Sequence, residues 1–266
     1  MSLSLAALQT AAGAAAGALD WQVLADTDST MSAAQRRLAA GFLPPLVVFA
    51  DSQSAGRGRM GRPWISPPAA HLYLTLAWHF DAAPQALAGL APCIGIALVR
   101  ALRHCGLTAQ LKWPNDILLA GAKLGGILIE LKAQREGSIA LIGVGLNHAM
   151  PASAAQAIDQ PWTDLASHLD PLPSREQVGG AVVAAMVERL DAFARDGFAP
   201  LVAEYDAAHA MHGQALWLIQ GKDKRAAIAD GIDPDGALRV RVDGRLQRCV
   251  SGEISLRARA VDPPLS

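Results

Sequence analysis

The chain has 266 residues, a formal net charge of −1, and 52% hydrophobic against 18% charged residues. This length can bury the core of one large or two smaller domains, and the near-neutral charge gives no electrostatic argument for nucleic-acid or membrane binding. Cys93, Cys105 and Cys249 are widely spaced without a C-x-x-C pair, which argues against a disulfide framework or a zinc site and suits a reducing cytosol.

The alanine-rich N-terminus does not have the features of a secretory signal. No lysine or arginine precedes Arg36, so the positively charged region of such a signal is missing. No uninterrupted apolar run approaches the roughly 20 residues that cross a bilayer. We therefore expect residues 1–25 to form a helical or frayed extension of a cytoplasmic protein without a membrane anchor.

Strand and helix signals mix irregularly through the middle of the chain, which favours an α+β domain over a doubly wound one. We assign this domain to residues 26–212. The helix after Ser174 has a plausible N-cap, with Glu and Gln close behind. The predicted strands are Leu46–Ala50, Leu72–Trp78, Ala109–Trp113, Gly126–Leu131 and Ile139–Leu146, and the predicted helices are Ser32–Ala40, Gln85–Cys105 and Arg175–Arg195.

From Gly213 onward the chain changes to short strands separated by turns. Asp235-Gly236 and Asp243-Gly244 are tight-turn dipeptides, and the second is expected to join two strands as a hairpin. The predicted strands are Ala215–Ile219, Arg225–Ala229, Ala237–Val242 and Leu246–Val250. We expect residues 213–266 to form a small β-barrel docked on the main domain.

The segment Gly56–Trp64 contains three arginines, three glycines and a tryptophan. Arginine suits phosphate and carboxylate groups, and glycine allows backbone N–H groups to approach an anion closely. An indole adds a flat face for a base. The pattern favours a loop that holds an anionic ligand, and a solvated turn is the alternative for this loop taken alone.

Gly56, Gly58 and Gly61 also fit the G-x-G-x-x-G pattern of dinucleotide-binding folds. That fold needs a helix directly after the loop, and the prolines within Pro63–Pro68 exclude one. A protein-kinase loop is excluded because no H-R-D or D-F-G motif follows, and no Walker A sequence occurs.

A second polar segment, Lys112–Asp116, closes a predicted strand and is followed by Lys123. Two lysines, an amide and a carboxylate at neighbouring strand ends would converge on one anionic ligand with its metal. The alternative is a polar hairpin whose Pro-Asn-Asp turn only connects two strands.

Taken in order, these motifs resemble those of the biotin protein ligases, over almost the whole chain from Asp26 to Arg257. The resemblance implies a mixed-sheet catalytic domain and a small C-terminal SH3-like barrel. It also implies activation of biotin by ATP to biotinyl-5′-AMP, with Mg²⁺, and transfer to a lysine of a biotin carboxyl carrier domain, as in acetyl-CoA carboxylase. The motifs are Asp28-Ser29-Thr30, Gln53 through Trp64, Ser66-Pro67, Lys112–Asp116, Lys123–Leu128, Gly143–Asn147 and Gly252–Arg257.

The resemblance also assigns site residues. Ser29, Thr30 and Gln53 have the donors and acceptors that biotin's ureido group needs, although Ser29-Thr30 also fits a helix N-cap. Asp116 would orient or deprotonate the incoming lysine, and Trp64 would be an adenine platform unless it only packs in the core. The implied biotin-binding residues are Ser29, Thr30, Gln53, Arg57, Gly58, Arg59 and Lys123; the nucleotide-binding ones are Arg62, Trp64, Asn115 and Asn147; the catalytic ones are Lys123, Arg59, Asp116 and Lys112.

Several positions depart from the family pattern: Met31 where asparagine is common, Met60 where a basic residue is common, His71 where asparagine is common, and Ala69-Ala70 in place of a more glycine-like turn. About 25 residues precede the first motif, so we expect no DNA-binding domain and no binding of DNA. The rival functions are a lipoate or octanoate ligase of related fold and a noncatalytic nucleotide- or RNA-binding module. The sequence leaves a monomer and a homodimer equally open.

Overall fold

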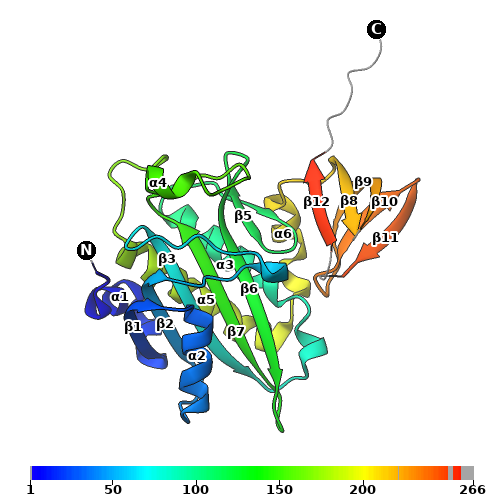
Figure 1. The fold of residues 1–266 in the computed structure, drawn as a ribbon. Coiled ribbons are helices and arrows are strands. Elements are labelled where there is room, and N and C mark those ends of the chain that lie inside the picture. The colour runs from blue at the N-terminus through cyan, green and yellow to red at the C-terminus, as the bar shows by residue number, and fades with distance from the viewer. Residues whose placement is uncertain (1, 221, 251–253, 259–266) are drawn as a thin grey trace.

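A seven-stranded mixed sheet forms the larger part of the molecule (Figure 1). The computed structural model describes residues 2–220, 222–250 and 254–258. The strand order is β1-β2-β3-β7-β6-β5-β4, with β1 and β2 parallel and the other neighbours antiparallel. The strands are β1 (Asp20–Thr27), β2 (Leu46–Gln53), β3 (His71–Phe80), β4 (Gln110–Lys112), β5 (Asp116–Leu119), β6 (Ala122–Ala133) and β7 (Ser138–Asn147).

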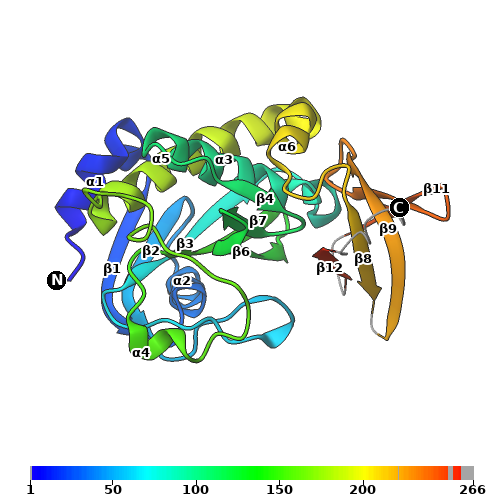
Figure 2. The same ribbon diagram turned by 90° about the horizontal axis from the view of Figure 1, so that it is seen from above.

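Helices cover both faces of this sheet. Figure 2 shows α1, α5, α3 and α6 along one face and α2 with α4 on the other. The larger core lies under the first group, whereas Met31 of α2 packs with Val48 and Leu141 in a smaller core on the second face. The helices are α1 (Leu5–Ala12), α2 (Thr30–Ala39), α3 (Leu90–His104), α4 (Ala152–Ala155), α5 (Arg175–Asp196) and α6 (Val202–Ala208), with short 3₁₀ turns at Gly13–Ala18, Arg59–Gly61, Pro84–Leu87 and Ala199–Leu201.

The ends of the long helices follow from their sequence. Ser174 caps α5 by accepting from the Gln177 backbone N–H, and the Gln177 side chain accepts from the Ser174 N–H, which completes a capping box. The stretch Pro84–His104 is long and apolar enough to cross a membrane, with a mean hydropathy of 1.6 in its most apolar window. That window is 72% buried inside the fold, as in the core helix of a globular domain.

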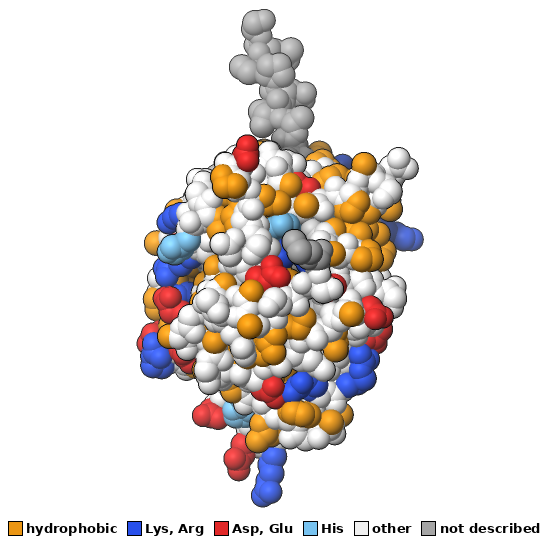
Figure 3. Space-filling view, turned by 90° about the vertical axis from the view of Figure 1, so that its left-hand side faces the viewer, with side chains coloured by type: hydrophobic (Ala, Val, Ile, Leu, Met, Phe, Trp, Pro, Cys, Tyr) orange, Lys and Arg blue, Asp and Glu red, His pale blue; other side chains and the backbone are white. Residues whose placement is uncertain are grey.

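The first twenty-five residues are integrated with the main sheet. Helix α1 packs on α5, where a Cβ on Gly180 would lie 2.4 Å from the Ala11 side chain. The backbone N–H of Leu3 donates to both carboxylate oxygens of Asp51, and Arg175 forms a buried ion pair with the same carboxylate. Strand β1 then pairs with β2 as the edge of the sheet. Acidic and basic side chains are interspersed on the face that carries α1 and β1 (Figure 3).

The C-terminal residues form a separate five-stranded antiparallel sheet of the SH3-like type, confirming the expected fold class. Its order is β11-β10-β9-β8-β12, an open sheet over the described residues. Asp243 and Gly244 both have positive φ, 50° and 75°, in the predicted hairpin turn between β10 and β11. The strands are β8 (Ala215–Gln220), β9 (Asp223–Ile232), β10 (Leu238–Val242), β11 (Arg245–Cys249) and β12 (Ile254–Ala258). Gly252 and Glu253 of the last motif lie outside the described residues.

Candidate functional site

The Gly56–Trp64 loop folds back on itself as a tight hairpin. The Gly58 N–H donates to the Arg62 carbonyl at 2.8 Å, and the Trp64 N–H donates to the Gly56 carbonyl at 2.9 Å. Met60 lies at the tip with φ 56° and is 63% exposed. The position where this chain has methionine in place of a basic residue is therefore at the outer end of the loop.

Trp64 lies on a floor made by two glycines that face each other across β6 and β7. A Cβ on Gly145 would lie 2.5 Å from indole Cε2, and one on Gly126 would lie 3.5 Å from Cζ3. Lys123 Nζ is 5.5 Å from the centre of the ring. The indole N–H is buried without a hydrogen-bond partner among the described residues. A buried unpaired donor is costly, so an acceptor supplied by a ligand would stabilise this position.

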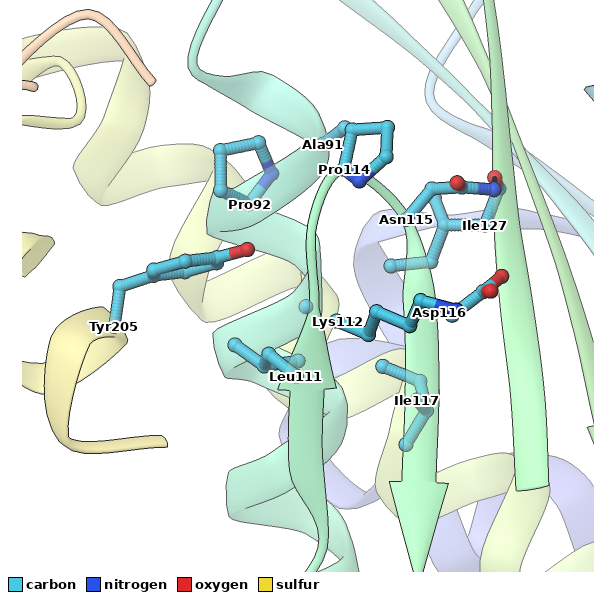
Figure 4. A pocket seen from close by; sticks show the side chains of 11 residues that line it. Ala91, Pro92, Leu111, Lys112, Pro114, Asn115, Asp116, Ile117, Ile127 and Tyr205 are labelled. Carbon is cyan, nitrogen blue, oxygen red and sulfur yellow. Dashed lines mark hydrogen bonds between the residues drawn. The ribbon is translucent and has the colours of Figure 1, made fainter. Parts of the chain in front are cut away.

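The Lys112–Asp116 turn joins β4 to β5 (Figure 4), and its polar groups contact Lys123 and Arg59. The Asp116 carboxylate accepts from Lys123 Nζ at 2.7 Å. The Asn115 side chain donates to the Ile127 carbonyl and accepts from Arg59 Nη1 at 3.2 Å. The turn thus holds both Lys123 and an arginine of the loop.

Positive charge is concentrated at this turn. Burial lowers the pKa of Lys112, Asp116 opposes the shift, and the neighbouring charges of Lys123, Arg257 and Arg62 lower it further. Burial likewise lowers the pKa of Arg59 from its ordinary value. Cations held this close together repel one another, and a bound polyanion would offset that repulsion.

A cavity of about 470 Å³ opens between the loop and β6, within the size range of small-molecule sites. Its walls are the loop residues from Arg57 to Gly61, Ala91 at the start of α3, Pro114 and Asn115 of the turn, and β6 from Ile127 to Glu130. A narrower cleft continues from it along Lys112 and Asp116 to Tyr205 of α6 (Figure 4).

The residues assigned to the ureido group form a second polar cluster. Gln53 Oε1 accepts from the Thr30 N–H at 2.8 Å, and Gln53 Nε2 donates to Ser66 Oγ at 3.0 Å. Thr75 donates to the Thr30 hydroxyl at 2.9 Å. Ser29 is the N-cap of α2 and accepts from the Ser32 N–H. Ser29 is therefore a helix N-cap, whereas Thr30 and Gln53 are hydrogen-bonded to each other.

The other assigned residues do not all meet. Arg57 Nη2 lies 3.4 Å from Ser32 Oγ and 3.8 Å from Glu130 Oε1, on the opposite side of the loop from the Arg59 contact. Asn147 Nδ2 donates to the Thr163 carbonyl at 2.9 Å, and the Thr163 N–H donates to the Lys123 carbonyl. Asn147 therefore connects the strand bearing Lys123 to the segment after α4.

Sequence patterns did not point to several residues that complete this geometry. Ser66 belongs to the Ser66-Pro67 motif without an assigned role, yet its hydroxyl accepts a hydrogen bond from Gln53. Glu130 and Thr75 lie in strands, and the alternation of side chains along each strand is the one signal that could have placed them on the face of the site. Trp162 forms an isolated β-bridge with Lys123 at the edge of the site. Trp162 and its neighbour Pro161 lie in an irregular stretch, where no hydrophobic periodicity indicates a structure.

His71, one of the departures from the family pattern, is buried beside the site. Its Nδ1 accepts from the His148 N–H at 3.0 Å, and its Nε2 lies 3.2 Å from the Met150 sulfur. Burial lowers the pKa of His71 to about 4. The side chain is therefore a neutral acceptor for the backbone, a task that asparagine also performs.

Buried neutral histidines predict that the fold loses stability in mild acid. Burial lowers the pKa of His71 and of His209 to about 4, so the unfolded chain binds these protons first as the pH falls below 6.5. We expect the free energy of unfolding to fall between pH 6.5 and 4, by on the order of 3 kcal/mol per histidine. Urea unfolding at pH 7 and pH 4.5 measures this, and His71→Asn should lose less stability over the interval than the unchanged chain. An equal loss in both would contradict the prediction.

The chain resembles known proteins over both of its parts. Residues 23–147 match the Biotin/lipoate A/B protein ligase family, and residues 218–257 match the Biotin protein ligase C terminal domain. The biotin–[acetyl-CoA-carboxylase] ligase of Paracoccus denitrificans is 37% identical over 82% of this chain and 93% of its own length. The bifunctional ligase/repressor BirA of Escherichia coli is 35% identical over 79% of this chain, and the match spans 66% of the length of that relative. A solved biotin protein ligase from Aquifex aeolicus, in complex with biotin and ATP, has the same fold, with a TM-score of 0.75 at 24% identity over 90% of this chain and 99% of the other.

Proposed function

Because this chain belongs to the biotin protein ligase family, we propose that it is an ATP-dependent ligase that attaches biotin to a lysine of a carrier protein. In the first step, biotin's carboxylate attacks the α-phosphate of ATP, which forms biotinyl-5′-AMP and releases pyrophosphate. In the second step, the carrier's lysine amine attacks the acyl carbon and releases AMP. Neither step needs a covalent bond to the enzyme.

One observation carries this proposal: the loop and the turn place Arg59, Lys123 and Asp116 together beside the glycine floor. Arg59 is held by Asn115 and Lys123 by Asp116, so both cations are fixed before a ligand arrives. The first step brings two anions together, and prepositioned cations at the point of attack lower that repulsion without reorganising. Lys112 and Arg62 add positive charge for the leaving phosphates.

The same pair serves the second step. Asp116 Oδ1 accepts from Lys123 Nζ at 2.7 Å, which holds the carboxylate in place. The carboxylate then accepts a proton from the incoming lysine ammonium and frees the amine for attack. Thr30 and Gln53 bind the ureido group at the far end of the biotin, where Ser66 and Thr75 already orient them.

Mg²⁺ is proposed as the companion of ATP. Magnesium is usually held by one or two carboxylates and substrate phosphates rather than by a protein cage. The described residues contain no group of three or more His, Cys, Asp or Glu side chains that could hold a metal ion, and Asp116 provides one carboxylate at the turn. The donor set fits an ion that arrives with the nucleotide and neutralises its phosphate charge.

The partner and location follow from this reaction as proposals. The acceptor is a biotin carboxyl carrier domain, as the name of the Paracoccus denitrificans relative indicates for that protein. We propose that the catalytic part is residues 26–212, that residues 213–266 dock on it, and that the protein acts in the cytoplasm without binding DNA.

The test is incubation of the protein with ATP, Mg²⁺ and either biotin or lipoate. We expect pyrophosphate release and labelling of a carrier domain with biotin only. A preference for lipoate would replace the proposal with the related lipoate reaction, and nucleotide binding without turnover would leave a binding module.

Gly145→Ala tests the glycine floor in this assay. The added Cβ would lie 2.5 Å from the Trp64 indole, so the ring must leave its place. We expect biotin-dependent pyrophosphate exchange to fall about tenfold or more, a loss of roughly 1.4 kcal/mol of transition-state stabilisation. Gly17→Ala is the control, because a Cβ at Gly17, in the 3₁₀ turn Gly13–Ala18, would meet no atom within 4 Å. Equal activity of the two variants would contradict a role for the floor.

A further inference from the structure

Trp113 lies inside the Lys112–Asp116 motif, yet the proposed reaction gives it no task. Its side chain is 2% exposed, and its indole N–H donates to the Gly236 carbonyl at 3.1 Å. Gly236 belongs to the turn between β9 and β10 of the C-terminal sheet. A single bond therefore connects the motif that holds Lys112 and Asp116 to the second sheet.

The turn that presents this carbonyl is held firmly in place. The Gly236 N–H donates to the Asp233 carbonyl at 2.8 Å, and Arg248 of β11 bonds both Asp233 and Asp235. Gly236 has φ 84°, and a Cβ there would lie 2.7 Å from Gly89 Cα at the start of α3. The turn is thus fixed within its own sheet and packed closely against the main domain.

A further hydrogen bond attaches the C-terminal sheet to the main domain. The carboxylate of Asp206, in α6, accepts from the Ile232 N–H of β9 at 3.0 Å. The segment that leads into the sheet is held as well, because the Leu111 carbonyl, next to the motif in β4, accepts from the Ala210 N–H at 2.8 Å. Trp113 is the member of this group that is continuous with the turn carrying Lys112 and Asp116.

The docked sheet brings a cation to the site. Arg257 lies on β12, opposite Trp217 of β8, and is close enough to Lys112 for its charge to disfavour protonation of that lysine. This cation reaches the site only while the C-terminal sheet is docked, because Arg257 and the rest of β12 pair with β8 of that sheet.

We propose that Trp113 is a positioning residue for the nucleotide: its bond to Gly236 holds the C-terminal sheet so that Arg257 and Lys112 together face the phosphates of ATP. The inference rests on the proposed function for its ligand. Loss of the bond should weaken ATP binding and leave the biotin cluster at Thr30 and Gln53 intact, because its hydrogen bonds to Ser66 and Thr75 lie within the main domain.

Trp113→Phe tests this by removing the donor and keeping an aromatic ring. We expect KM for ATP in pyrophosphate exchange to rise about tenfold, with kcat and KM for biotin within twofold of the unchanged enzyme. Transfer from supplied biotinyl-5′-AMP to a carrier domain should be unaffected. Trp21→Phe is the matched control, since its indole also donates to a backbone carbonyl, that of Ala16, at 3.0 Å, but in the N-terminal part.

Gly236→Ala approaches the same contact from the other side, through the close packing on Gly89, and should show the same rise in KM for ATP. If Trp113→Phe behaved like Trp21→Phe, or if Gly236→Ala left KM for ATP unchanged, the proposal would be wrong. Amide hydrogen exchange of residues 233–237, measured without ligand, gives a readout independent of the biotin reaction. Faster exchange in Trp113→Phe than in Trp21→Phe supports the coupling even if the unchanged protein does not activate biotin, and equal exchange overturns it.

Discussion

Replacing Lys123 by methionine is expected to lower biotin-dependent pyrophosphate exchange by about 10²–10³-fold, the usual effect of removing one prepositioned charge from a reacting centre. Lys123 Nζ is 2.7 Å from Asp116 Oδ1 and 5.5 Å from the Trp64 ring, and the side chain is 18% exposed. At this depth its charge is only partly screened by water. The variant also leaves the Asp116 carboxylate without its ion-pair partner, so the second step should slow as well.

Lys132→Met is the matched control for this variant. Lys132 lies on the same strand, β6, but is exposed and does not line the cavity. Its replacement should leave the exchange rate within twofold. Thermal unfolding of both variants separates loss of chemistry from loss of the fold. A Lys123→Met protein that exchanged pyrophosphate at a third of the normal rate or more would remove Lys123 from the reaction.

Arg59→Gly is expected to release the activated biotin before the carrier arrives. Arg59 is partly buried and joins the loop to Asn115 of the turn, so its loss frees one side of the loop from the site wall. Biotinyl-5′-AMP is a mixed anhydride that acylates any amine it meets once it leaves the site. We expect at least a tenfold rise in labelling of lysines on an unrelated protein added to the reaction, with exchange still detectable.

The readout for Arg59→Gly is the ratio of bystander to carrier labelling. Arg135→Gly, in the exposed turn between β6 and β7, is the control and should keep the ratio of the unchanged enzyme. A variant that was inactive towards both proteins would mean that Arg59 acts in catalysis alone and does not retain the intermediate.

The central strands could be predicted from the sequence because their burial follows from local pattern. Leu46–Ala50 is a continuous apolar run and Leu72–Trp78 is apolar except at Thr75, and both lie in buried strands. Strand β1 was not predicted: Asp20–Thr27 alternates only weakly, and most of it fell within the predicted extension of residues 1–25. Its place depends on parallel pairing with a strand nearly twenty residues later, which no local window reveals.

The helix predicted over Gln85–Cys105 begins only at Leu90. A 3₁₀ turn occupies Pro84–Leu87, and Gly89 is the N-cap of α3 at a point where a Cβ would lie 2.5 Å from the Phe198 side chain. Phe198 is more than one hundred residues away. A contact of this range overrides local helical spacing and cannot be read from it.

The residues of the site could be named from motifs, but their pairing could not. Arg57 and Arg59 stand two residues apart, yet Arg57 lies towards Glu130 and Arg59 bonds Asn115. Which arginine meets which partner depends on the fold of the loop, set by the positive φ angles of Met60 and Gly61. Methionine gives no sequence signal for that conformation.

The pairing of β12 with β8 has a consequence for how the protein is made. The last described strand of the chain fills the open edge of a strand that left the ribosome almost forty residues earlier. Since domains assemble from the N-terminus during synthesis, the biotin cluster and the glycine floor are complete before Arg257 emerges. A nascent or prematurely terminated chain therefore exposes the edge of β8, a template for unwanted strand pairing. A chain that still lacks β12 therefore holds the Lys112–Asp116 turn without Arg257 beside Lys112.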